Sequence, residues 1–294
     1  MKILYLSPGL LADYQCDMVF HGLRTLYGAD VVDCHKIQPM YQGHQGAIYG
    51  QGFTLYRLLP DIEVDRIAIQ ERISAHEFDI VIYGSIQRYS PYFDLVIAKY
   101  KRHEILFIDG EDQSSLLFNL TRLGLYFKRE LASHIPQVHP IHFAIPACKI
   151  MTQHHLPRNK VRAFIDPRDR KTYIYKTEQE YYSDYAQSLF AFTTKKGGWD
   201  CLRHYEIMAN GCIPLFLDLP DCPETTCMQL PKSELLEALT LQHLDGRYWD
   251  TQEGHKHWLS LHRRIHLKFA CFSTTERLAE YVLKTQAGEA SLAA

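Results

Sequence analysis

The residues best suited to chemistry in this 294-residue chain lie in one segment, residues 195–206, which reads KKGGWDCLRHYE. It brings Lys195, Lys196 and Arg203 close to the pair Gly197-Gly198. Cationic side chains form charge-assisted bonds to phosphate oxygens, and glycines let the backbone approach a ligand closely. A helix is expected to follow the glycines, and the free amides and partial positive charge of a helix start favour an anion. The segment therefore predicts a binding site for a diphosphate.

Glu206 adds a carboxylate to this segment. It stands three residues after Arg203, on the same face of the expected helix and about one turn further in. A carboxylate there can accept hydrogen bonds from both hydroxyls of a ribose, although a surface salt bridge with Arg203 is the alternative. Trp199 has two interpretations: it stacks on a nucleotide base, or it fills the junction between the two domains. Its residue type favours the second interpretation.

Candidates for acid–base chemistry follow an expected strand in the first half: Asp109, Glu111 and Asp112. Attack by a hydroxyl needs a base that takes its proton, with a pKa matched to its surroundings. We predict Asp109 as this base, with an ordinary polar turn over residues 109–112 as the alternative. His21 is a further candidate, but it is more typical of a helix surface or a core edge.

The sequence lacks the motifs that are typical of several other kinds of site. No Gly-x-Gly-x-x-Gly run follows the first expected strand and no Walker lysine loop is present, which disfavours a dehydrogenase or a P-loop enzyme. Cys222 and Cys227 lack the paired spacing of a zinc site. Residues 109–112 lack an Asp-x-Asp arrangement for a divalent ion. The prediction therefore includes no metal and no cofactor.

Alternating strand and helix patterns must position these residues. In the first half, short apolar runs predict strands at 3–6, 29–33, 79–84 and 105–108, and helices at 17–27, 64–76 and 91–100. In the second half the same reasoning predicts strands at 189–192 and 213–217, a helix ending near Ser188, and helices at 202–210, 232–239, 251–269 and 275–284. This order predicts an α/β fold with two Rossmann-like domains that face a cleft, residues 1–150 and residues 151–294.

The stretch from residue 38 to residue 61 has aromatic residues and glycines but little periodicity. Loops of this length inside a compact domain are uncommon and are often functional. Two interpretations stay open, a substrate-facing loop and a merely mobile one, and the aromatic residues favour the first.

Composition narrows the class of protein. The chain is 46% hydrophobic and 22% charged, which suits two domains with well-buried cores. Its formal net charge of -2 gives no global field for nucleic acid, so a nucleic-acid partner is not expected. The eight cysteines are scattered, which indicates reduced thiols, and no apolar stretch approaches the roughly 20 residues that span a bilayer. We expect a cytoplasmic protein without a transmembrane segment.

Residues 198–214, GWDCLRHYEIMANGCIP, resemble the C-terminal donor-binding segment of glycosyltransferases with the GT-B fold. The segment is similar both to the retaining family with two Glu residues and to exostosin-like enzymes. The resemblance implies that Glu206 holds the nucleotide ribose and that Lys195, Lys196 and Arg203 bind the diphosphate. Gly198 stands where the first Glu of the two-Glu pattern would be, so retaining stereochemistry is not implied. No early strand is evident between residues 160 and 176, so the C-terminal domain is expected to be trimmed or to hold the nucleotide differently.

The function implied is that of a metal-independent, hexosyltransferase-like glycosyltransferase. A nucleotide sugar would be the co-substrate, bound in the C-terminal domain, and the acceptor would be a hydroxyl of a glycan, a lipid-linked precursor or another polar molecule on the N-terminal side. The alternatives are an inactive nucleotide-binding or scaffold protein and, more weakly, a DNA-base glycosyltransferase. The predicted site comprises the base Asp109 and the donor-binding residues Lys195, Lys196, Gly198, Trp199, Arg203, His204 and Glu206.

Overall fold

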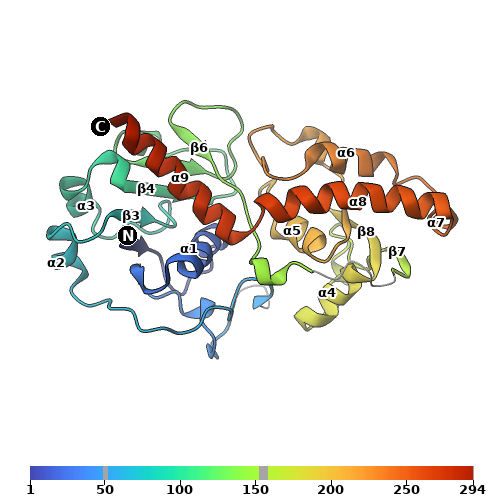
Figure 1. Cartoon of the computed structure of the whole chain (residues 1–294), viewed down its shortest axis with the longest axis horizontal. Coiled ribbons are helices and arrows are strands. Elements are labelled where there is room, and N and C mark those ends of the chain that lie inside the picture. Colours follow the sequence, from blue (N-terminus) through green and yellow to red (C-terminus); the bar gives the residue numbers. More distant parts are fainter. Residues whose placement is uncertain (49–51, 152–157, 294) are drawn as a thin grey trace.

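A parallel sheet of six strands forms the N-terminal half of the computed structural model, which describes residues 1–48, 52–151 and 158–293 (Figure 1). The strand order is β2-β1-β3-β4-β5-β6, and every neighbouring pair is parallel. The strands are β1 (Ile3–Leu6), β2 (Val31–Cys34), β3 (Ile80–Tyr83), β4 (Ile105–Asp109), β5 (Leu125–Lys128) and β6 (Val138–Pro140). Strands β1, β3, β4 and β5 are buried along their whole length, as expected of parallel strands covered on both faces.

Three helices join these strands: α1 (Tyr14–Tyr27), α2 (Ile69–Ser74) and α3 (Phe93–Lys99). Helix α1 begins three residues before the predicted start because the Asp13 side chain accepts a hydrogen bond from the Cys16 amide and caps the helix. It ends at Gly28, whose φ of 53° suits glycine. Helix α2 is shorter than predicted and starts after Ala68, which has a φ of 51°.

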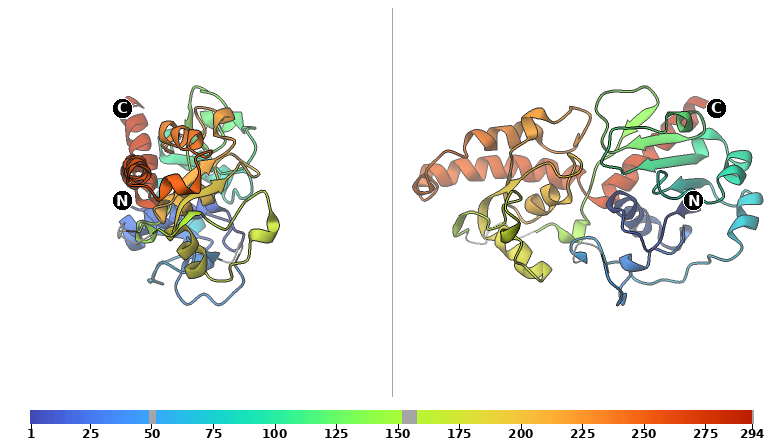
Figure 2. Two further views of the ribbon diagram at one scale, coloured as in Figure 1. Left: turned by 90° about the vertical axis from the view of Figure 1, so that its right-hand side faces the viewer. Right: turned by 180° about the vertical axis from the view of Figure 1, so that it is seen from behind.

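The second sheet has three parallel strands in the order β7-β8-β9: β7 (Lys160–Arg162), β8 (Ser188–Thr193) and β9 (Ile213–Phe216). Strand β7 corrects the expectation that no early strand lies between residues 160 and 176. The helices of this half are α4 (Glu178–Ala186), α5 (Leu202–Ala209), α6 (Lys232–Thr240), α7 (Gly246–Trp249) and α8 (Gln252–Phe272). Seen from behind, the two sheets occupy opposite halves of the molecule (Figure 2).

The last helix, α9 (Thr275–Ala293), follows α8 and returns to the six-stranded sheet, where it lies beside α1 (Figure 1). A Cβ on Gly22 would lie 1.9 Å from the Thr275 carbonyl oxygen, so only glycine permits this approach of α1 to α9. His21 Nδ1 lies 2.8 Å from Thr275 Oγ1 at the same contact. Helix α9, the last helix of the chain, therefore packs against the N-terminal half. The domain boundary near residue 150 stays a prediction.

Among the described residues, no helix combines the length and the apolar character needed to cross a bilayer. The two parallel sheets establish a mixed α/β fold compatible with two Rossmann-like units. Their arrangement brings the ends of several strands toward a shared cavity.

Candidate active site

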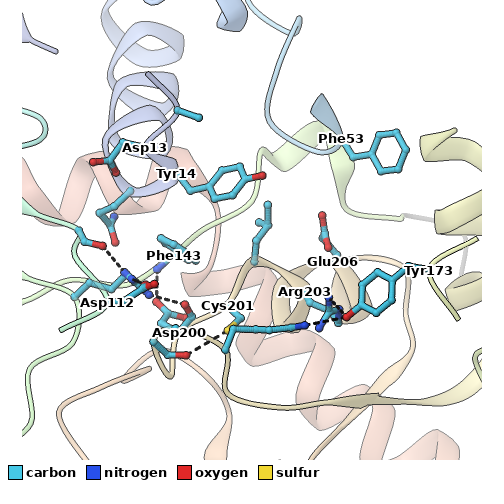
Figure 3. Close-up of a pocket in the computed structure, with 18 of the residues that line it drawn as sticks. Asp13, Tyr14, Phe53, Asp112, Phe143, Tyr173, Asp200, Cys201, Arg203 and Glu206 are labelled. Atoms are coloured by element: carbon cyan, nitrogen blue, oxygen red, sulfur yellow. Dashed lines mark hydrogen bonds and ion pairs between the residues drawn. The ribbon is translucent and has the colours of Figure 1, made fainter. Parts of the chain in front are cut away.

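A cavity of about 970 Å³ lies between the two halves (Figure 3). Segments that follow β1, β4 and β8 line it, as expected because ligands of parallel α/β sheets bind beyond the carboxyl ends of the strands. Residues contributed by the N-terminal half include Asp13, Tyr14, Phe53, Gly110, Asp112 and Arg129, and those of the C-terminal half include Ile165, Tyr173, Tyr175, Tyr181, Lys196, Gly198, Arg203 and Glu206.

Two cationic side chains that line this cavity donate hydrogen bonds to the same hydroxyl oxygen. Lys196 Nζ donates to the Tyr173 hydroxyl at 3.0 Å, and Arg203 Nη2 donates to the same oxygen at 2.7 Å. Arg203 Nε and Nη1 are buried and have no hydrogen-bond partner. In the described part of the chain, no carboxylate lies within ion-pairing distance of Lys195, Lys196 or Arg203. The cavity therefore presents two cationic side chains, Lys196 and Arg203, that suit an anionic ligand.

Glu206 lies beside these cations and is only 6% exposed. Its Oε1 accepts a hydrogen bond from Thr54 Oγ1, and its Oε2 accepts one from the Tyr181 hydroxyl, both at 2.6 Å. Burial raises the pKa of this carboxyl above its usual range, while the two hydroxyl donors oppose that shift. The described residues show no ion pair between Glu206 and Arg203, so the salt-bridge alternative does not describe this side chain.

The start of α5 is open to a ligand. Cys201 occupies the N-cap position and makes no capping hydrogen bond through its side chain. The glycines before it pack closely against side chains of the N-terminal half. A Cβ on Gly197 would lie 2.0 Å from Oδ2 of the exposed Asp112, and one on Gly198 would lie 2.3 Å from Oε1 of the buried Glu130. Close backbone approach was predicted here, and the groups approached in this structure are carboxylates of the N-terminal half.

Glu130 and Arg129, which follow β5, hold the loop between β8 and α5. Glu130 accepts hydrogen bonds from the Trp199 and Asp200 amides at 2.9 and 3.0 Å, and Arg129 Nη1 donates to the Asp200 carbonyl at 2.6 Å. Asp200 in turn accepts from the Phe143 amide at 2.6 Å. Sequence reasoning missed these residues, although three consecutive charged residues directly after an apolar run at residues 125–127 were an available signal.

Lys195, a predicted diphosphate-binding residue, does not line the cavity, and neither do Trp199 and His204. Trp199 is partly buried against the core, with Lys195 Nζ 4.4 Å above its ring centre. The His204 ring is buried, lies 2.9 Å from both Thr193 Oγ1 and the Trp199 carbonyl, and stacks on Phe216. The structure therefore gives both residues contacts that support the loop, whereas Lys196, Gly198, Arg203 and Glu206 line the cavity itself.

The buried histidines predict acid sensitivity. Burial lowers the pKa of His21, His142 and His204 to about 4 in the folded protein, against about 6.5 in an unfolded chain. Between these values the unfolded chain binds protons that the folded protein does not, so the free energy of unfolding falls as the pH is lowered through this window. We expect His204→Gln to reduce proton uptake on unfolding at pH 5 by about one proton. Urea unfolding across this pH range measures the free energy of unfolding at each pH. If its slope against pH is the same in His204→Gln as in wild type, the assignment is contradicted. The exposed His243→Gln is the control.

Asp109 is fully buried and does not line the cavity. Its carboxylate pairs with the buried Lys128 ammonium at 2.9 Å and accepts hydrogen bonds from Gln87 and Tyr126. The structure therefore does not place the predicted base in the cavity. Two carboxylates of the N-terminal half line the cavity: Asp112, which pairs with Arg129, and Asp13, which accepts a hydrogen bond from Ser85 Oγ at 2.6 Å.

Asp109→Asn is expected to lower the free energy of unfolding by about 3 kcal/mol, because it leaves the Lys128 ammonium buried without its carboxylate. Thermal or urea denaturation measures this loss. Asp61→Asn is the matched control, since it breaks the half-exposed pair with Lys36 and should change stability by less than about 1 kcal/mol. Equal losses of unfolding free energy in the two variants would show that the buried Asp109–Lys128 pair contributes no more to stability than the half-exposed pair.

The arrangement thus defines a mixed α/β protein with a cleft that presents unpaired cations next to a buried carboxylate. No protein-family model matches the chain, and no curated protein matches it either. In the described residues no group of three or more His, Cys, Asp or Glu side chains is placed to hold a metal ion.

Proposed function

We propose that this chain is a glycosyltransferase of the GT-B architecture that moves a sugar from a nucleoside diphosphate sugar to an acceptor hydroxyl. The observation that carries the proposal is the pair Lys196 and Arg203, which converge on the Tyr173 hydroxyl without a carboxylate partner in the described chain. Two cations near a helix start without a side-chain cap suit a diphosphate, because its negative charges would pair with both cations.

The leaving group explains why these cations matter for chemistry. When the bond between the sugar and the diphosphate breaks, negative charge develops on the diphosphate oxygen. Lys196 and Arg203, which both line the cavity, would stabilise that charge. This arrangement supports a transfer that needs no metal ion.

The acceptor side of the proposal rests on Asp13. Figure 3 shows this residue at the start of α1, on the N-terminal side of the cavity. Its carboxylate is held by the Cys16 amide and Ser85 Oγ, so its orientation is fixed before any ligand binds. We assign to Asp13, in place of Asp109, the role of the base that takes the proton of the acceptor hydroxyl. The acceptor is a glycan, a lipid-linked precursor or another polar molecule.

Thermal unfolding with a panel of ligands tests the donor site directly. We expect one of UDP, GDP, ADP or CDP, and also inorganic pyrophosphate, to raise the midpoint. A ligand at 100 times its Kd adds about 2.7 kcal/mol to the free energy of unfolding. Failure of every ligand to stabilise the protein would overturn the proposal. Binding of a nucleotide without a transferred or hydrolysed sugar product would instead favour an inactive nucleotide-binding protein.

A further inference from the structure

Residues 52–56, here called the crossing segment, link the N-terminal half to the candidate donor site. Its far end belongs to the N-terminal core, where Leu55 is buried and the Tyr56 hydroxyl donates to Asp17 Oδ2 at 2.8 Å. Its near end reaches the C-terminal half at Phe53 and Thr54. The crossing segment therefore places two residues from the N-terminal half against α4 and α5.

Thr54 fixes this crossing by three hydrogen bonds. Its amide donates to Glu178 Oε1 at 2.7 Å, and its hydroxyl lies 2.5 Å from the Tyr182 hydroxyl and 2.6 Å from Glu206 Oε1. The backbone of Thr54 has a φ of 72°, which a β-branched residue rarely adopts. Such a conformation persists only where the surroundings determine it, and it is enriched at ligand-binding sites.

Phe53 is thereby presented to the cavity at a defined place. Its ring stacks on Tyr181 with centres 5.9 Å apart, and Tyr181 is the residue that donates to Glu206. Ile165 and Tyr175 line the same cavity, so this part of it is largely aromatic and apolar. A flat, weakly polar ligand group would be favoured here.

Resting on the function proposed above, we propose that the nucleoside of the donor is bound by both halves of the protein, with Phe53 stacking on the base and Thr54 positioning the ribose-binding carboxylate. In Figure 3 the labelled side chains follow the order Arg203, Glu206, Phe53. That order matches the sequence of diphosphate, ribose and base along a nucleoside diphosphate. Each carboxylate oxygen has two acceptor positions, so Glu206 can receive the ribose hydroxyls while Thr54 and Tyr181 still donate to it.

Thr54 acts through Glu206 and is therefore a positioning residue. Thr54→Val removes the hydroxyl that donates to Glu206 Oε1, whereas Thr54→Ser keeps it. We expect the valine variant to lose affinity for the nucleoside diphosphate about tenfold and the serine variant to retain it, because one hydrogen bond to a charged group is worth about 1.5 kcal/mol. Inorganic pyrophosphate, which has no ribose, should bind both variants equally. Equal nucleotide affinity in the valine and serine variants would remove the positioning role.

The decisive comparison measures the binding of the stabilising nucleoside diphosphate and of inorganic pyrophosphate to wild type, Phe53→Ala, Phe53→Trp and the control Phe272→Ala. Phe272 is 54% exposed at the end of α8 and does not line the cavity. Because stacking on an aromatic ring is worth roughly 1–3 kcal/mol per base, Phe53→Ala should bind the nucleotide about tenfold more weakly, with pyrophosphate binding unchanged. Phe53→Trp should bind like wild type.

The outcomes separate this inference from the proposed function. If wild type binds neither ligand, the donor site itself is absent and both proposals fall. If wild type binds the nucleotide and Phe53→Ala binds it equally well, the donor site stands and the role of the crossing segment is overturned. An equal loss of nucleotide and pyrophosphate affinity in Phe53→Ala would also overturn it, since stacking on the base cannot alter the binding of pyrophosphate.

Discussion

Replacing Glu206 by alanine is expected to weaken binding of the nucleoside diphosphate about 100-fold and to leave inorganic pyrophosphate binding unchanged. The carboxylate would lose two charge-assisted hydrogen bonds to ribose hydroxyls, each worth about 1.5 kcal/mol, and about 2.8 kcal/mol corresponds to 100-fold in Kd. Calorimetric titration measures both affinities. The same titration with the 2′-deoxy nucleotide identifies the partner: wild type should discriminate against it, and Glu206→Ala should not.

A matched control is available because Glu234 is equally buried, with 6% exposure, but lies on α6 and pairs with Lys268. Glu234→Ala also removes a buried carboxylate, and its nucleotide affinity should remain that of wild type. Undiminished discrimination against the deoxy nucleotide in Glu206→Ala would show that this carboxylate does not bind the ribose. The comparison therefore separates a ligand contact from a general effect of losing a buried charge.

The central strands of the larger sheet could be predicted because parallel strands covered on both faces read as short, continuous apolar runs. β1, β3 and β4 fit this description, and their predicted bounds agree with the structure within one residue. β5 ends in a buried lysine, β6 contains a proline, and β7 has only three residues with exposed ends. β5 has an apolar run of only three residues before its ion-paired lysine, and β6 and β7, at the edges of their sheets, have none, so the pattern did not predict these strands.

The donor half of the candidate site could be predicted because its residues are close in sequence. Lys196, Arg203 and Glu206 share one loop and one helix, so their spacing alone placed them together. Thr54 and Glu206 are 152 residues apart, and no local pattern brings such a pair into contact. Tyr173 was missed for the same reason, since it meets Arg203 from a loop 30 residues earlier in the chain.

The predicted base failed to reach the cavity for a physical reason visible only in three dimensions. The sequence shows Asp109 at a strand end, and it is there, but the neighbouring strand β5 places Lys128 opposite it. A lysine inside a buried strand needs a carboxylate, and Asp109 supplies it. Asp13 was not predicted, because the helix was expected to begin at residue 17; its cap position and its place in the cavity are both visible only in the structure.

Asp13→Asn is expected to lower kcat for sugar transfer by about 10²–10⁴-fold, the usual contribution of a general base, with nucleotide affinity unchanged. Asparagine is well suited to isolate this effect because it caps a helix about as well as aspartate, so α1 should keep its start. The carboxylate would be replaced by an amide that cannot accept the acceptor's proton. Initial rates at saturating donor, together with the calorimetric affinity, measure the two quantities separately.

Asp245→Asn is the matched control, since Asp245 caps α7 through the Arg247 amide and does not line the cavity. It should transfer sugar at the wild-type rate, which would exclude a general effect of amide substitution at a helix cap. Wild-type turnover in Asp13→Asn would remove the assigned base while leaving the donor site intact. A loss of turnover that is accompanied by an equal loss of donor affinity would instead show that Asp13 binds the donor, because a base acts only on the acceptor's proton and has no contact with the diphosphate.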